Sequence, residues 1–187
     1  MRLPMTRLYS VIISVFLGCN SLLNAQAQSA DSTSLDGLFR YFKTEHMWDA
    51  KVKIGGAIGL GESKRGGRNI IPITGGTFQG PDIKGEVLPG GADWQNVRPD
   101  GDVELYARYL LRTDSGHMIQ VINQALIHNA PDNSKNGPYL KSVVDIEAPA
   151  NSPYSHLNHA IFLGTLTIPQ LKPGEEPYVI IGVYKVL

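Results

Sequence analysis

The chain has 187 residues, of which 42% are hydrophobic and 18% charged, so it can form one domain with a substantial core and is too apolar to be disordered throughout. Lys+Arg and Asp+Glu both number 17, and the sequence has no polybasic run. This balance argues against proteins that bind nucleic acid or anionic lipid through a basic surface. We therefore expect neither nucleic acid nor, once an N-terminal signal has been removed, a membrane as a partner.

Residues 1–27 have the pattern of an export signal. Basic residues precede a mostly apolar run, and Ala25-Gln26-Ala27 supplies the small residues that a signal peptidase accepts. Two alternatives stay open: a retained N-terminal anchor, and cleavage before a lipid-modified Cys19. The pattern predicts a periplasmic or secreted protein. Because Cys19 is the only cysteine, cleavage after Ala27 would leave a domain without disulfides, held together by its core alone.

The rest of the chain divides into residues 28–46, predicted to be a polar leader with a short helical or irregular segment, and residues 47–187, the predicted domain. Short runs in which apolar and polar residues alternate are separated by turns rich in glycine, proline and aspartate. The expected strands are Trp48–Ile54, two short runs within Ile70–Trp94, Glu104–Thr113, His117–His128, Tyr139–Glu147, Leu157–Ile168 and Tyr178–Leu187. Gly55–Gly67 is expected to be a loop over one end of the fold.

This pattern predicts an all-β domain, a single antiparallel β-barrel or sandwich of about eight or nine strands. A closed barrel is favoured because the last strand, Tyr178–Leu187, is very apolar and would invite aggregation on an open edge.

Several short motifs resemble the family known as domain of unknown function 3237. They are Gly67-Arg68, Pro72–Phe78, Gly80-Pro81, Gly85–Gln95, Arg98–Gly101, Ala107–Tyr109, the strand around Asn123, Glu147–Pro149 and Leu157-Asn158. The resemblance runs from about Trp48 to the C-terminus. It implies a small lipocalin-like antiparallel barrel and no established activity. Many relatives have an acid where this chain has Tyr106, and often a tryptophan in place of His156, so a cavity lined by these positions would take a different ligand here.

Asp93-Trp94 is the first candidate site. A carboxylate beside an indole, at the end of a glycine-rich turn, suits a partly desolvated acid or an anchor for a ligand hydroxyl. Alternatively, Asp93 caps the turn and Trp94 seals the end of the barrel.

The strand that begins at Glu104 offers two opposite faces. One carries Arg108 with other polar residues, and the other carries Tyr109 with apolar residues. Two interpretations stay open: an apolar interior that includes Tyr109, with Arg108 in an exposed ion pair, or Arg108 turned inward as a clamp for an anion.

Asn123 shares a strand face with apolar residues, so its amide must serve either as a structural strut or as a ligand contact. Glu147 and Asn158 stand near proline-rich turns, where pocket mouths form. Together, Asp93 and Glu147 could provide two carboxylates for general acid–base chemistry.

No metal site or cofactor is expected. His156 and His159 are three residues apart, which on a strand sends them to opposite faces, and no third ligand is visible. A Gly-x-Ser-x-Gly elbow for serine catalysis is also missing from the sequence.

The leading hypothesis is an exported barrel that binds a small, partly apolar, oxygenated molecule in its cavity, with a homo-oligomer as an open option. The residues expected to meet in that cavity are Asp93, Trp94, Arg108, Tyr109, Asn123, Glu147 and Asn158. The first alternative is a cofactor-free isomerase, lyase or cyclase with Asp93 or Glu147 as general base, and Arg108 and Asn123 stabilising an oxyanion. The second is a structural barrel with no ligand, whose cavity would be well below about 300 Å³.

Overall fold

The structure is a computed structural model that describes residues 42–128 and 137–187, and residues 43–187 form one compact unit. Residues 1–41 and 129–136 lie outside this description, and with them lie the predicted export signal, Cys19 and most of the predicted leader. Among the described residues, no helix is long and apolar enough to cross a membrane.

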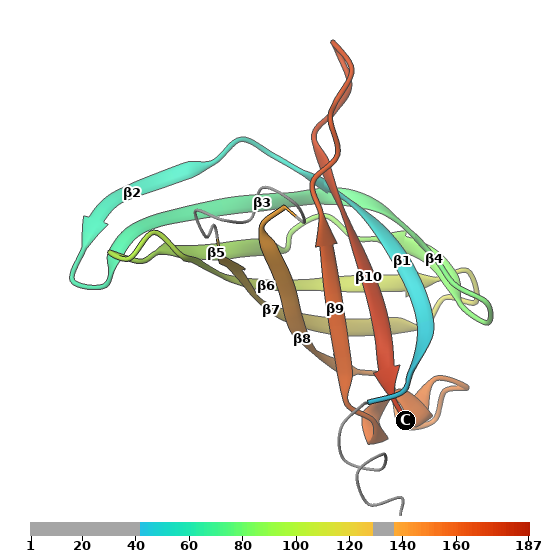
Figure 1. Ribbon diagram of the computed structural model, residues 1–187. Helices are drawn as coiled ribbons and strands as arrows, with labels where there is room; N and C mark the ends of the chain where they lie inside the picture. The colour runs from blue at the N-terminus through green and yellow to red at the C-terminus, as the bar shows by residue number, and fades with distance from the viewer. Residues whose placement is uncertain (1–41, 129–136) are drawn as a thin grey trace, which may run out of the picture. The chain divides into compact units, whose positions relative to one another are not determined.

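The regular secondary structure of the described residues is almost entirely β-strand (Figure 1). The strands are β1 Thr44–Ile54, β2 Ile58–Ser63, β3 Gly66–Gln79, β4 Lys84–Val87, β5 Ala92–Val97, β6 Val103–Thr113, β7 Met118–His128, β8 Tyr139–Glu147, β9 Phe162–Thr167 and β10 Tyr178–Val186. A 3₁₀ turn, η3, spans Ser155–His159 between β8 and β9.

The strands form one antiparallel sheet that closes into a barrel. The order runs β1-β10-β9-β8-β7-β6-β4-β3-β2, and β1 also pairs with β3 to close the ring. Both β4 and β5 lie between β3 and β6, so these two short strands share one place in the ring. On the other side of β3, β2 and β1 pair with its first and second halves. The result is an eight-strand barrel with β2 as an outlying strand, which confirms the predicted fold class.

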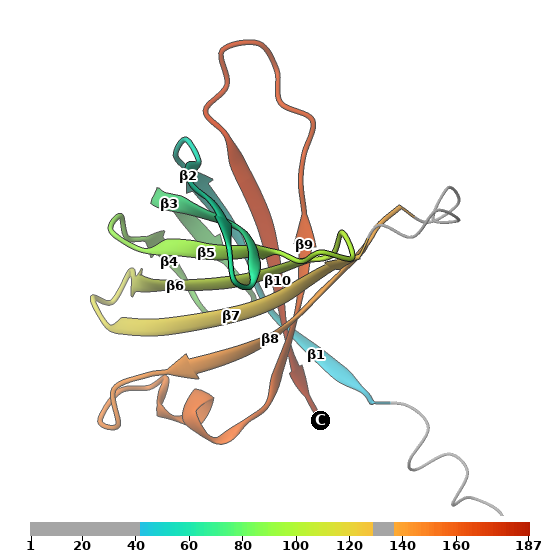
Figure 2. The same cartoon turned by 90° about the vertical axis from the view of Figure 1, so that its left-hand side faces the viewer.

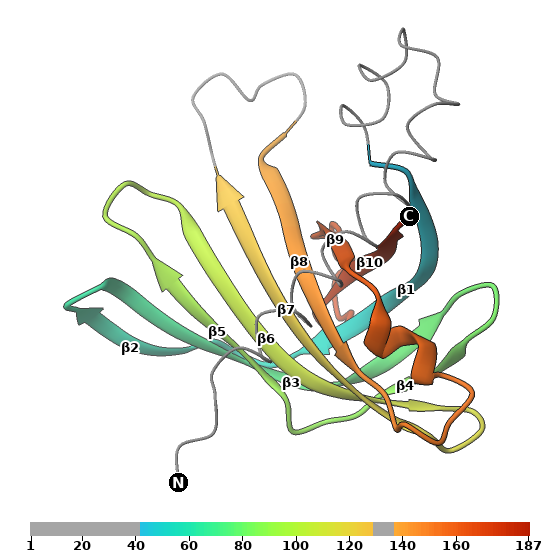
Figure 3. The ribbon, with the colours of Figure 1, turned by 90° about the horizontal axis from the view of Figure 1, so that it is seen from below.

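Because the sheet twists, the direction of the strands changes around the barrel. Strands β5 to β8 lie side by side in Figure 2, whereas in Figure 1 β9 and β10 run at a steep angle to β3, β5 and β6. Figure 3 shows the curved wall made by β3 and β5 to β8, with β1 and β10 on the side toward which this wall curves. This closure removes the exposed edge that the apolar strand β10 would otherwise present.

The core lies inside the barrel because alternate residues of each strand point inward. In β8 the pattern is nearly perfect: Ser142, Val144 and Ile146 are buried, while their neighbours are exposed. Trp48 is fully buried and packs edge-on against Phe78, with 6.0 Å between their ring centroids. Leu111 and Ile119, which are paired across β6 and β7, are also fully buried.

Two local predictions were wrong. Gly55–Gly67 is not a loop: its residues Ile58–Ser63 form β2, which pairs with β3. Leu157–His159 belong to the 3₁₀ turn instead of a strand, so the strand-based argument about His156 and His159 does not apply. In addition, the first strand starts at Thr44, inside the segment predicted to be helical or irregular.

Candidate functional site

A cavity of about 210 Å³ lies inside the barrel, between β3, β5, β6 and β7 on one side and β1, β9 and β10 on the other. Most of its lining is aliphatic, contributed by residues such as Ile73, Leu105 and Ile181. Four polar side chains join this lining: Asp93, Gln95, Tyr109 and Asn123. A mostly apolar cavity with a few polar groups is the usual composition of a small-molecule site.

The register of three strands brings the polar groups together. Asp93 of β5 pairs with Ala107 of β6, and Ala107 pairs with Asn123 of β7, so the three residues form one inward-facing row. Ala107 is small, which leaves open space between the carboxylate and the amide. Neighbouring strands are about 4.8 Å apart, so the backbones at Asp93 and Asn123 are roughly 10 Å apart along the sheet. One small molecule can therefore contact both side chains.

Asp93 is only 9% exposed and is partly satisfied by hydrogen bonds. The side-chain amide of Gln95 donates to its Oδ2 at 2.8 Å, and the backbone amide of Tyr106 donates to the carboxylate. Burial raises the pKa of Asp93, and these two hydrogen bonds oppose the shift. Its Oδ1 has no partner among the described residues. Asp93 is thus a desolvated acid with one free acceptor atom.

Tyr109 and Asn123 carry the other unpaired polar atoms. They are 3% and 5% exposed, and neither the Tyr109 hydroxyl nor the Asn123 Oδ1 has a partner among the described residues. Burial raises the pKa of Tyr109, so its hydroxyl stays neutral. Leaving such a group buried and unpaired costs about 1–3 kcal/mol. Three of the residues that line the cavity therefore each carry a polar atom that no described residue hydrogen-bonds.

The cavity holds three of the seven residues that the sequence grouped together: Asp93, Tyr109 and Asn123. The expectation that all seven converge is wrong. Because successive strand residues alternate in direction, Trp94 points outward and is 52% exposed. Arg108 also points outward and donates to the side-chain oxygen of Gln120 at 2.9 and 2.6 Å, which excludes an inward anion clamp.

Glu147 and Asn158 also lie away from the cavity. Glu147 is exposed at the end of β8, so it cannot act with Asp93 as a pair of carboxylates in the cavity. The amide of Asn158 accepts a hydrogen bond from the backbone N–H of Ala148 at 2.8 Å and donates to the carbonyl of Ala148 at 2.9 Å. That double hydrogen bond ties the η3 turn to the end of β8.

Gln95 was missed by the sequence analysis. It orients Asp93 and also lines the cavity. Its signal was the alternation of Asp93, Gln95 and Val97 on one face of β5. The short strands expected within Ile70–Trp94 ended before Gln95, so this alternation was not followed far enough.

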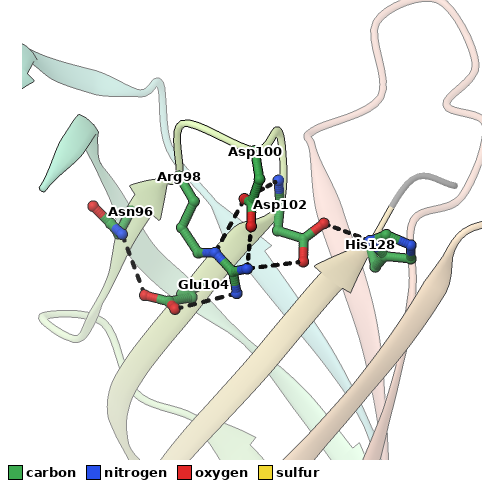
Figure 4. Close-up of polar contacts among 6 residues, drawn as sticks. All are labelled: Asn96, Arg98, Asp100, Asp102, Glu104 and His128. Atoms are coloured by element: carbon green, nitrogen blue, oxygen red, sulfur yellow. Dashed lines mark hydrogen bonds and ion pairs between the residues drawn. The ribbon is translucent and has the colours of Figure 1, made fainter.

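A second polar cluster surrounds the turn between β5 and β6 (Figure 4). The Arg98 guanidinium is paired with three carboxylates: Asp100, Asp102 at 3.5 Å and Glu104 at 3.6 Å. Two further contacts extend the cluster: Asn96 donates to Glu104 at 3.2 Å, and Asp102 lies 2.5 Å from the Nδ1 of His128. The charge of Arg98 is thereby neutralised locally. Among residues 42–128 and 137–187, no group of three or more His, Cys, Asp or Glu is arranged to hold a metal ion.

Comparison with known proteins gives a family match over residues 42–186, to a model described as "Protein of unknown function (DUF3237)". A UPF0311 protein of Rhodopseudomonas palustris is 40% identical over 84 residues, which are 45% of this chain and 55% of that protein. A UPF0311 protein of Clostridium acetobutylicum is 49% identical over 67 residues, which are 36% of this chain and 42% of that protein. The chain spans about half the length of these relatives.

Solved structures match over more of the chain. A conserved protein of unknown function from Rhodopseudomonas palustris is 30% identical with a TM-score of 0.68, covering 79% of this chain and 99% of that one. A beta-barrel-like protein from Acinetobacter baumannii is 31% identical with a TM-score of 0.67, covering 79% and 97%. A structure described as an enzyme from Penicillium herquei is 22% identical with a TM-score of 0.58, covering 78% and 95%; it shares the fold.

Proposed function

We propose, for a chain that belongs to the DUF3237 family of proteins of unknown function, that the barrel binds one small, partly apolar, oxygenated molecule in its interior cavity. The proposal rests mainly on one observation: Asp93, Tyr109 and Asn123 line the same apolar cavity, and each carries a buried polar atom that has no hydrogen-bond partner among the described residues. Two of these atoms are acceptors and the third is a hydroxyl. A ligand that brings hydroxyl or amine hydrogens would satisfy all three.

The cavity volume limits the size of this ligand. At about 210 Å³ it is below the roughly 300 Å³ at which ordinary ligand pockets begin. An apolar cavity of about 150 Å³ nevertheless holds benzene. The ligand is therefore one ring, or a short branched chain, with one or two polar substituents. A barrel without any ligand is the competing outcome.

An experiment on two neighbouring residues of β7 separates these outcomes. The protein is purified from its own host and analysed by native mass spectrometry, as wild type, as Asn123→Leu and as Gln124→Leu. Asn123 lines the cavity, whereas Gln124 points outward. We expect an additional non-covalent mass on the wild type and on Gln124→Leu, and its loss from Asn123→Leu. A wild type without any bound molecule favours the structural barrel.

A cofactor-free enzyme is the second candidate, and the burial of Asp93 supports it. An acid whose pKa is raised by desolvation, with a free oxygen beside a cavity, is suited to act as a general base. With Arg108 and Glu147 outside the cavity, Tyr109 and Asn123 are the side chains left to stabilise an oxyanion. Asp93→Asn would then abolish turnover of the identified ligand while its affinity stays within about tenfold, or 1.4 kcal/mol. A loss of affinity alone would favour simple binding.

An exported location, periplasmic or secreted, is part of the proposal and rests on the signal-like pattern of residues 1–27. N-terminal sequencing of the protein purified from its host checks it. We expect the mature chain to begin at Gln28. A chain that begins at Met1, or at a lipid-modified Cys19, contradicts cleavage after Ala27.

A further inference from the structure

A second hollow lies on the outer surface of the barrel, over β3 and β5 to β9. This outer groove has a volume of about 890 Å³, within the range of ligand-binding sites. Residues from two neighbouring outward-facing rows line it. The aromatic row contains Trp94, Tyr106, Gln124, Val143 and Leu163; the charged row contains Arg68, Asn96, Glu104, Leu126 and Lys141.

Strand register fixes the order within each row. Trp94 pairs with Tyr106, and Tyr106 with Gln124, so the indole, the phenol and the amide follow one another on adjacent strands. Trp94 is 52% exposed and Tyr106 42% exposed. Large aromatic side chains on neighbouring strands of an outer face offer ring surfaces on which a flat ligand can stack.

The charged row has a cation at each end and a neutralised centre. The carboxylate of Glu104 is held by Arg98 and Asn96, as Figure 4 shows, and Arg98 is itself matched by three carboxylates. In contrast, the side chains of Arg68 and Lys141 form no ion pair or hydrogen bond with any described residue. The groove therefore carries two unpaired positive charges.

These two cations set the length of the ligand. Four strand spacings of about 4.8 Å separate Arg68 from Lys141 along the row, or about 19 Å along the curved sheet. A compact anion cannot contact both of them at once. An elongated ligand with several negative groups can, while its rings cover Trp94 and Tyr106 and its hydroxyls reach Gln124.

We propose that the outer groove is a second binding site, for a short acidic oligosaccharide. Carboxylates of the sugar would pair with Arg68 and Lys141, and the apolar faces of its rings would stack on Trp94 and Tyr106. Because the groove offers only two unpaired cations beside a neutralised cluster, it lacks the continuous basic track that a nucleic-acid strand requires.

Isothermal titration calorimetry of the full chain with tetragalacturonate tests the proposal, with neutral maltotetraose as the uncharged control. We expect the acidic sugar to bind at least about tenfold more tightly than the neutral one, a difference of 1.4 kcal/mol or more. Arg68→Gln with Lys141→Gln should remove that preference, and added salt should weaken binding. The matched control is Lys172→Gln, at an exposed lysine outside the groove, which should leave the affinity unchanged.

Tryptophan fluorescence provides an independent readout. The chain has two tryptophans, and Trp48 is fully buried, so a Trp48→Phe variant leaves Trp94 as the reporter of the groove. Its emission should change with tetragalacturonate at the concentrations found by calorimetry. If Trp48→Phe fails to fold, the loss of calorimetric binding in Trp94→Ala gives the same information.

Several results would overturn the proposal. They are an absence of binding by either sugar, equal affinity for the two, or a preference that survives the double substitution. Tighter binding of a thymidine hexanucleotide would assign the groove to nucleic acid. Self-association of the wild type that Trp94→Ala abolishes, without sugar binding, would assign it to a second copy of the chain. The molecule retained in the interior cavity should be unaffected by the groove variants, so the two proposals fail separately.

Discussion

Asp93 and Trp94 are adjacent in the sequence and lie on opposite faces of the barrel wall. Asp93 is 9% exposed and borders the interior cavity, whereas Trp94 is 52% exposed and lines the outer groove. The period-two geometry of β5 separates them, so the carboxylate and the indole cannot form one site. They belong instead to two candidate sites, one on each side of a single sheet.

Asp93→Asn is expected to change the pH dependence of stability. Burial raises the pKa of Asp93 in the folded state, so the folded chain binds the proton more tightly than the unfolded chain does. The stability that this proton binding contributes is therefore present at low pH. It is lost as the pH rises from the pKa of Asp93 in the unfolded chain through its raised pKa in the folded chain. The asparagine amide remains neutral, and its oxygen can still accept the hydrogen bond from Gln95.

Urea unfolding from pH 3 to pH 8 measures this effect. As the pH rises above the ordinary aspartate pKa of about 4, the wild type should lose more stability than Asp93→Asn. Asp145→Asn, at an exposed site on β8, is the matched control and should follow the wild type. Parallel profiles for Asp93→Asn and the wild type would contradict a desolvated carboxyl at this position.

Tyr109→Phe should affect binding and stability in different ways. Because the hydroxyl has no partner among the described residues, its removal should leave the free energy of unfolding unchanged or raise it by about 1 kcal/mol. Affinity for the cavity ligand should fall about three- to tenfold, which corresponds to one hydrogen bond of about 0.5–1.5 kcal/mol. Thermal unfolding and titration with the identified ligand give the two values. A loss of stability of 2 kcal/mol or more with unchanged affinity would show that the hydroxyl has a structural partner.

Gly76→Ala should prevent the barrel from closing. Gly76 lies where β3 pairs with β1, and a Cβ there would come within 2.0 Å of the Lys51 carbonyl oxygen, at a φ of +140°. We expect a loss of about 4 kcal/mol or more, among the largest effects of a single substitution. Gly90→Ala is the matched control: its φ is +103° and nothing lies within 4 Å, so strain alone should cost about 1–2 kcal/mol. Equal losses in the two variants, measured by chemical unfolding, would mean that the β1–β3 contact is not the cause.

Asn158→Ala should destabilise the fold without affecting either ligand site. It removes both hydrogen bonds that join η3 to Ala148, at a cost of about 1–3 kcal/mol. Asn158→Asp keeps the acceptor for the Ala148 N–H and should recover part of the loss. Chemical unfolding measures both variants. Reduced retention of the cavity ligand in a folded Asn158→Ala protein would restore the site role that the sequence suggested.

The regular strands were the part of the fold that could be predicted. The strand predicted at Tyr139–Glu147 coincides with β8, because its inward and outward residues alternate without interruption. The pair formed by β6 and β7 was found within one residue at each end. The glycine-rich segments were harder to predict. Gly91 precedes β5, and a Cβ there would come within 2.6 Å of the Arg108 carbonyl, so this glycine permits close approach of strands.

The candidate site was harder to predict because it depends on register. Asp93 and Asn123 share a cavity only because both align with Ala107, and pairing across three strands is invisible in a one-dimensional pattern. The alternation of β6 did identify two faces, but charge alone could not say which one was inside. The structure assigns the inside to the face that carries Tyr109.

A crystal structure of the wild-type protein purified from its own host tests the central claim most directly. We expect density for a small molecule in the interior cavity, within about 2.6–3.2 Å of polar atoms of at least two among Asp93, Tyr109 and Asn123. A cavity that is closed by these side chains bonding to one another, or that holds only ordered water, would contradict it.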